Sequence, residues 1–143
     1  MTTRARIATN AMRAFVLLFG AAALWLARDG MNADGVAYLD ASDVYLGGGW
    51  PASGTGYWSP LYPTLLAAAR LVAGTAPGRE QAIAQSVNLA VFLLAFAALE
   101  FLIRSVRAAT LIRQPAGEPP NDLPWRVLVY ALFIVAAIGW IRV

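Results

Sequence analysis

The chain of 143 residues contains no cysteine and no histidine. These two absences exclude disulfide bonds, thiol chemistry, zinc sites built from Cys and His, and a Ser-His-Asp triad. Any acid–base or metal chemistry must therefore use carboxylates, tyrosines, side-chain amides or arginines.

Charged residues are also scarce, at 13% of the chain against about 25% in ordinary soluble domains. The hydrophobic fraction is 59% and the mean hydropathy is +0.60. A soluble fold of this length cannot bury so much apolar surface, whereas a lipid bilayer solvates it. The composition predicts an all-α integral membrane protein.

Lysine is absent, so the 11 basic residues are all arginines, and the formal net charge is +3. The arginines lie beside apolar segments, as topology signals do. They form no basic stripe of the kind that a nucleic-acid-binding domain presents, and we expect no nucleic-acid partner.

Three apolar segments predict three transmembrane helices, over residues 11–27, 82–104 and 125–141. The first is short, but the arginines beside it can extend their side chains to the interface. The alternative is a cleaved secretory signal. Cleavage after Ala27 would place the bulky Trp25 where small residues are preferred, so we expect a retained anchor.

Polar residues within the second segment invite two interpretations. Glu100 and Arg104 form an i,i+4 pair close to an interface, which we interpret as structural. Gln85, Ser86 and Asn88 lie in its outer half, where they can line a cavity or form hydrogen bonds between helices. A proline-rich irregular connector, residues 113–124, leads to the third segment.

Residues 61–74 are apolar but few, and they include Arg70, whose placement at mid-bilayer would cost about 2.5–3.5 kcal/mol. If this segment does not span, the positive-inside rule is obeyed. The cytoplasmic arginines are then Arg4, Arg6, Arg13, Arg104, Arg107, Arg113 and Arg126, and the outer ones are Arg28, Arg70, Arg79 and Arg142. We therefore predict an interfacial or re-entrant helix at 61–74, a cytoplasmic N-terminus, an outer loop at 28–80 and a cytoplasmic connector at 105–124.

The outer loop is acidic and rich in aromatic residues. We expect Asp34 to cap a short helix over residues 36–46, in which Asp40 and Asp43 share a face. Glycines 47–49 should end that helix. The aromatic residues that follow have polar tips suited to a membrane interface, and they are Trp50, Tyr57, Trp58 and Tyr62.

Two interpretations of this loop stay open from the residues alone. In the first, Asp34 is a helix cap, Asp40 and Asp43 are solvated, and the aromatic residues form an interfacial belt. In the second, a carboxylate takes a proton from an acceptor hydroxyl or holds a divalent cation such as Mg²⁺ or Mn²⁺ beside a phosphate. Aromatic faces would then stack on sugar rings.

The run DGVAYLDASDVYLGGGW at 34–50, followed by GYWSPLYP at 56–63, resembles the N-terminal part of bacterial GT-C glycosyltransferases. These multi-span enzymes, akin to protein O-mannosyltransferases, move a sugar from a polyprenyl-phosphate carrier. Their first outer loop carries an essential aspartate and contains helices that lie along the membrane. By position, the resemblance implies that Asp34 is the general base or a metal ligand. It also implies candidate substrate-binding roles for Asp40, Asp43, Tyr57, Trp58 and Tyr62.

The resemblance further implies a bacterial inner-membrane protein with the acidic loop in the periplasm. Relatives often carry Asp-Glu or Asp-Asp where this chain has Asp34-Gly35, and they run to several hundred residues. We therefore expect the N-terminal part of such an enzyme, with membrane lipid, a polyprenyl-phosphate sugar donor and a separately encoded remainder as partners. The alternatives are a small non-catalytic membrane protein, either an assembly partner or a degenerate relic, and a transporter fragment.

Overall fold

The computed structural model describes residues 3–49, 59–76, 78–113 and 123–141. These residues form an all-α fold of five helices. They are α1 (Thr3–Leu26), α2 (Ala33–Leu46), α3 (Leu61–Ala73), α4 (Glu80–Arg113) and α5 (Leu123–Ile141).

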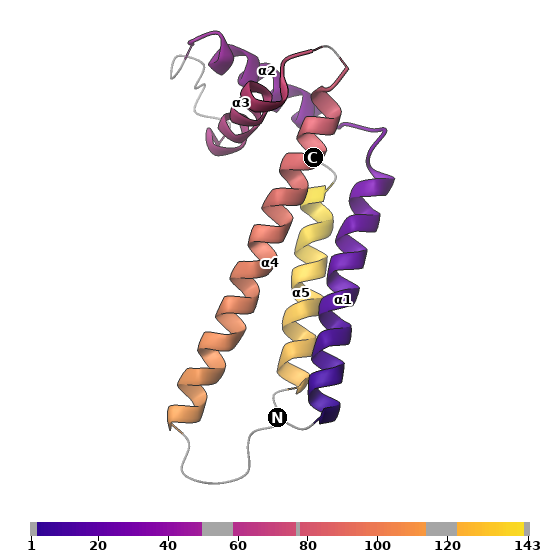
Figure 1. The fold of residues 1–143 in the computed structure, drawn as a ribbon, viewed down its shortest axis with the longest axis vertical. Coiled ribbons are helices and arrows are strands. Elements are labelled where there is room, and N and C mark those ends of the chain that lie inside the picture. Colours follow the sequence, from indigo (N-terminus) through magenta and orange to yellow (C-terminus); the bar gives the residue numbers. More distant parts are fainter. Residues whose placement is uncertain (1–2, 50–58, 77, 114–122, 142–143) are drawn as a thin grey trace.

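The long helices α1, α4 and α5 lie side by side, and α2 and α3 lie together at one end of them (Figure 1). α1 and α5 run toward that end and α4 runs away from it. We call α2 and α3 the head, and the opposite end of the three long helices the connector end. The order of long helix, two short helices and two long helices matches the expected loop between the first and second apolar segments.

The predicted apolar segments correspond to α1, α4 and α5, and two of these helices extend well beyond their predicted membrane spans. α1 already begins at Thr3, and α4 continues to Arg113, past the predicted end at residue 104. Alanine, arginine and leucine in these flanks favour helix, and no proline or glycine interrupts them within the helices. At the connector end, α1 and α4 therefore extend beyond the apolar segments by polar helical turns.

Two described helices are long and apolar enough to cross a membrane, within Ala5–Leu26 and Glu80–Thr110. In each, 22% of the most apolar window is buried, whereas the core helix of a soluble protein is mostly buried. The described part of α5 contributes a shorter apolar stretch, Leu123–Ala137. Two of the three predicted spans therefore reach spanning length among the described residues.

The head helices begin and end at recognisable signals. Asn32, not Asp34 as predicted, is the N-cap of α2, because its Oδ1 accepts the Gly35 N–H at 2.8 Å. Asp34 is the second residue of α2, two positions after the N-cap. α2 ends at Gly47, as predicted, and Gly48 then takes a φ of 81° that favours glycine. α3 forms the short helix expected at 61–74.

Two clusters of buried side chains hold these parts together. The first joins α1, α4 and α5 around Val16, Phe92, Ile103 and Tyr130. The second joins the head to α4 around Leu66, Ala84 and Val87, with Tyr38 and Tyr62 packed against it.

Candidate functional site

The head is organised around Arg70, whose side chain is only 4% exposed. Its Nη1 donates to Ser42 Oγ at 2.8 Å, and its Nη2 lies 2.7 Å from Asp43 Oδ1 and 3.6 Å from Glu80 Oε1. One guanidinium of α3 thus binds α2 and the start of α4. A buried guanidinium without such partners would be strongly destabilising, so these contacts explain how an arginine is accommodated in an apolar helix.

Asp43, a predicted substrate-binding residue, is therefore an ion-pair partner of Arg70, although its side chain is still 58% exposed. From the sequence alone, Arg70 was used only to infer that residues 61–74 do not span the membrane, and its ion pairs were not predicted. A usable signal was present: a lone arginine in a short apolar helix needs carboxylates, and Asp43 and Glu80 lie in the flanking segments.

Asp34 and Asp40 are exposed on α2. They lie six residues apart, which separates them by about 120° around the helix axis, so they do not share a face. Asp34 lies in the first turn of α2, where the helix dipole favours a negative charge. The structure therefore brings Asp43 to Arg70 and leaves the other two carboxylates available to a molecule at the surface.

A divalent cation at Asp34 stays a prediction, since Mg²⁺ is commonly held by one or two carboxylates together with a substrate phosphate. Among the described ranges, no three or more Asp and Glu side chains come together in a group that could hold a metal ion. Cys and His, the other usual ligands, are absent from the chain. We therefore derive no step that depends on a metal.

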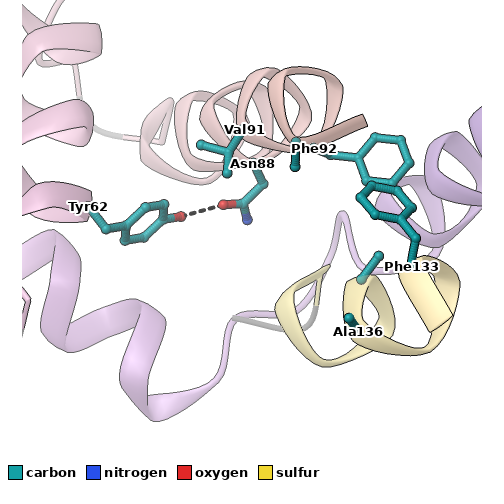
Figure 2. A pocket seen from close by; sticks show the side chains of 8 residues that line it. Tyr62, Asn88, Val91, Phe92, Phe133 and Ala136 are labelled. Atoms are coloured by element: carbon teal, nitrogen blue, oxygen red, sulfur yellow. Dashed lines mark hydrogen bonds between the residues drawn. The ribbon is translucent and has the colours of Figure 1, made fainter. Parts of the chain in front are cut away.

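A cavity of about 310 Å³ lies between α3, α4 and α5 (Figure 2). Its α4 side is a single helix face, with residues spaced at i, i+3, i+4 and i+7. The lining residues are Tyr62 from α3, Asn88, Val91, Phe92 and Ala95 from α4, and Phe133, Ala136 and Ala137 from α5. The walls are apolar except for the side chains of Tyr62 and Asn88.

Tyr62 connects the head to this cavity. Its hydroxyl donates to Asn88 Oδ1 at 2.6 Å, as Figure 2 shows, and its ring meets the Tyr38 ring of α2 edge-on, with centroids 5.0 Å apart. Burial raises the pKa of Tyr62 above its ordinary value, because it disfavours the phenolate, and the hydrogen bond to Asn88 only partly opposes this. Tyr62 therefore stays a hydrogen-bond donor at neutral pH. Trp50, Tyr57 and Trp58 lie outside the described residues.

The polar residues of the outer part of α4 differ in what they contact. Asn88 both lines the cavity and bonds to another helix. Gln81 Nε2 and Gln85 Nε2 donate to the Gly30 and Ala27 carbonyls at 3.0 and 3.4 Å, which ties α4 to the segment after α1. Ser86 Oγ donates within α4, to the Ala82 carbonyl.

A second polar cluster lies toward the connector end, around Glu100. Arg13 Nε and Nη2 donate to its two oxygens at 2.9 and 2.5 Å, and the Tyr130 hydroxyl also donates to it. The predicted pair with Arg104 is present at 3.8 Å but is the longest of these contacts. Glu100 thus joins α1, α4 and α5, in agreement with its structural interpretation.

No protein-family model, curated protein or solved structure matches this chain. The likeness to GT-C enzymes accordingly stands on the sequence run at 34–63 alone.

Proposed function

We propose that this chain is the membrane-embedded N-terminal part of a glycosyltransferase that moves a sugar from a polyprenyl-phosphate carrier to an acceptor at the outer face of the membrane. The observation that carries the proposal is the apolar cavity between α3, α4 and α5, which reaches the head at Tyr62 and Asn88. The head in turn exposes the carboxylates of Asp34 and Asp40.

Membrane insertion explains the exposed apolar faces of the long helices. Phe15, Leu18, Leu94, Phe101 and Leu132 are all more than half exposed, and lipid would cover them. A cleaved α1 would take away Arg13, the main partner of Glu100, and would uncover α5. We therefore treat α1 as a retained anchor and α5 as a third span beside it.

Orientation follows from charge. The connector end carries Arg6, Arg13, Arg104, Arg107 and Arg126, whereas the head and its flanks hold five carboxylates and three arginines. The positive-inside rule then puts the connector end in the cytoplasm and the head in the periplasm of a bacterial inner membrane.

The cavity suits the chain of a lipid-linked substrate. Its volume is at the lower end of the range for small-molecule sites, about 300–1,000 Å³, and apolar walls with a few polar groups are typical of such sites. An isoprenoid segment against Val91, Phe92 and Phe133 would place the polar part of the lipid toward Tyr62 and the head.

In the proposed reaction, an acceptor hydroxyl oxygen attacks the anomeric carbon of the donor sugar. The bond from that carbon to the phosphate oxygen breaks, the polyprenyl phosphate leaves, and Asp34 takes the hydroxyl proton. Arg70 is already bound to Asp43 and Glu80, so the described head residues offer no comparable site for the phosphate. We assign the phosphate to the separately encoded remainder of the enzyme.

Cavity filling tests the binding half of the proposal. We expect a photoreactive polyprenyl phosphate to cross-link to peptides of α4 and α5 in the membrane-inserted chain, and Ala95→Trp to abolish this labelling. Ala97→Trp is the matched control, because Ala97 is also exposed but lies two positions further along α4, on the opposite side of the helix from the cavity-lining Ala95. Equal labelling of both variants would remove the cavity from the proposal.

The catalytic half is tested by Asp34→Asn in membranes that contain the complete enzyme. We expect loss of sugar transfer with unchanged membrane insertion and unchanged cross-linking, because the amide cannot take the proton. Asp29→Asn is the matched control, because it neutralises an exposed carboxylate in the segment just before α2 that has no proposed role. Full transfer by the Asp34→Asn variant would exclude its role as the base. Labelling without any transfer activity would favour the non-catalytic assembly partner.

A further inference from the structure

A second cavity, of about 370 Å³, lies at the connector end between α1, α4 and α5. Five of its lining side chains are arginines, and none of its described lining residues is acidic. The arginines are Arg6, Arg13, Arg104, Arg107 and Arg126, and Thr9 lies among them. We call this the arginine cavity. Its lining residues come from α1, the second half of α4 and the start of α5, at the connector end, and the head lies at the other end of these helices (Figure 1).

The arginine cavity is built from fixed side chains as well as exposed ones. Arg126 is buried, and its Nη1 donates to the buried Thr9 Oγ1 at 2.9 Å. Arg13 is held by Glu100 and by Asn10 Oδ1 at 3.2 Å. Arg6 and Arg104 are exposed at its rim. An anion that enters the cavity is thus attracted by both its floor and its rim.

The chemistry of the cavity selects a phosphate group. Guanidinium groups bind phosphate oxygens through paired N–H donors, and charge-assisted bonds of this kind are about twice as strong as neutral ones.

The surroundings of the cavity point to a lipid as the carrier of that phosphate. Exposed apolar side chains, Ile7, Phe101 and Leu102, flank the lining residues on α1 and α4. With the orientation proposed above, this end meets the inner leaflet, where anionic lipids attract arginines. Acyl chains could then lie along the apolar helix faces while the phosphate enters the cavity.

We infer that the arginine cavity binds the phosphate of an anionic phospholipid headgroup. The inference uses the proposed membrane insertion but not the sugar-transfer activity. Loss of sugar transfer in Asp34→Asn would not contradict lipid binding at the arginine cavity. Loss of lipid binding there would not contradict the proposed role of the cavity at Tyr62. A soluble phosphate compound shares the recognised group, and the experiment separates the two sources.

The test compares phosphatidylglycerol with phosphatidylcholine of the same acyl chains, bound to the purified full chain in detergent and counted by native mass spectrometry. We expect phosphatidylglycerol to bind more tightly. The double variant Arg6→Gln/Arg107→Gln should weaken its binding by about tenfold or more, since each arginine near an anionic surface contributes on the order of fivefold. The matched control, Arg28→Gln/Arg79→Gln, removes two charges at the head end and should change binding by less than about twofold, because it lies more than a Debye length away.

The phosphate source is decided by a soluble competitor. Glycerol phosphate without acyl chains should compete only weakly if a lipid is the ligand. If it binds as tightly as the lipid, the phosphate site stands but its source is soluble. Equal binding of both lipids together with no effect of glycerol phosphate would overturn the inference, because the cavity would then not select an anionic headgroup.

Equal losses in the two double variants would also overturn the inference, because binding would then follow net charge and not the cavity. Should the glutamine variant fail to fold, Arg6→Lys/Arg107→Lys keeps the charge and removes the paired donors. It should bind phosphatidylglycerol more weakly than the unchanged chain and still prefer it to phosphatidylcholine. No loss of affinity in the lysine variant would contradict recognition by paired donors.

Discussion

Arg70 and Arg126 are both buried, and each donates to a buried hydroxyl of another helix, that of Ser42 or Thr9. A hydroxyl can accept from the guanidinium while it donates elsewhere: Ser42 to the Leu39 carbonyl at 2.7 Å, and Thr9 to the Ala5 carbonyl at 2.9 Å. Each arginine therefore anchors its helix to a specific turn of a neighbouring helix. Directional contacts of this kind determine register more than apolar packing does.

Arg70→Gln should release α2 from α3. We expect a loss of about 1–3 kcal/mol, the usual range for hydrogen bonds to a charged group, since the carboxylates left behind are largely exposed. Hydrogen exchange of the α2 amides, Ala33–Leu46, would measure the release of this helix. Thermal unfolding in detergent would measure the loss of stability. Arg79→Gln removes the same charge from an exposed site nearby and should leave both unchanged. Undiminished protection of α2 in Arg70→Gln would mean that the apolar contacts of Tyr38 and Leu39 hold it alone.

At the scale of elements, the existence and type of the helices could be predicted, but several ends could not. Apolar length indicates the long helices, yet it says nothing of the polar turns that extend them, so α1 and α4 continue beyond the predicted membrane spans. Asn32 and Asp34 are both good capping residues two positions apart. Which one caps depends on how the chain turns after α1, and that turn is tied down by the hydrogen bond from Gln81 to the Gly30 carbonyl.

Packing of α1 on α4 depends on Gly20, because a Cβ there would overlap the ring of Phe92. Phe92 is buried against Phe133, with ring centroids 5.7 Å apart, so it cannot simply move aside. Alanine in place of a helical glycine ordinarily stabilises by about 0.5–1 kcal/mol. We expect the opposite sign for Gly20→Ala, a loss of about 1–3 kcal/mol from overpacking.

Thermal unfolding in detergent measures this effect, and Gly20→Ala/Phe92→Leu supplies the control. The smaller leucine makes room for the new methyl group, so the double variant should be more stable than Phe92→Leu alone. Stabilisation by Gly20→Ala alone would show that α1 and α4 do not pack as described.

At the scale of the whole molecule, the sequence could identify candidate residues but not which of them meet. Tyr62 and Asn88 are 26 positions apart, and both were candidates from residue type and place in the chain. The cavity they share depends on the placement of α3, α4 and α5, and no local pattern encodes that placement. Arg70 was missed as an organising residue for the same reason, since its partners come from α2 and α4.

The opposite ends of the long helices should lie on opposite sides of the membrane. The absence of cysteine makes this directly testable, because a single introduced cysteine is the only thiol in the chain. We expect an impermeant maleimide to label Ala76→Cys, exposed between α3 and α4, in intact spheroplasts, and to label Ala109→Cys, exposed near the end of α4, only after permeabilisation. If α3 crossed the bilayer, as in the transporter alternative, Ala76→Cys would be labelled from the cytoplasm. That outcome would move α3 and its Arg70 contacts into the bilayer and would remove the periplasmic head on which the sugar-transfer proposal depends.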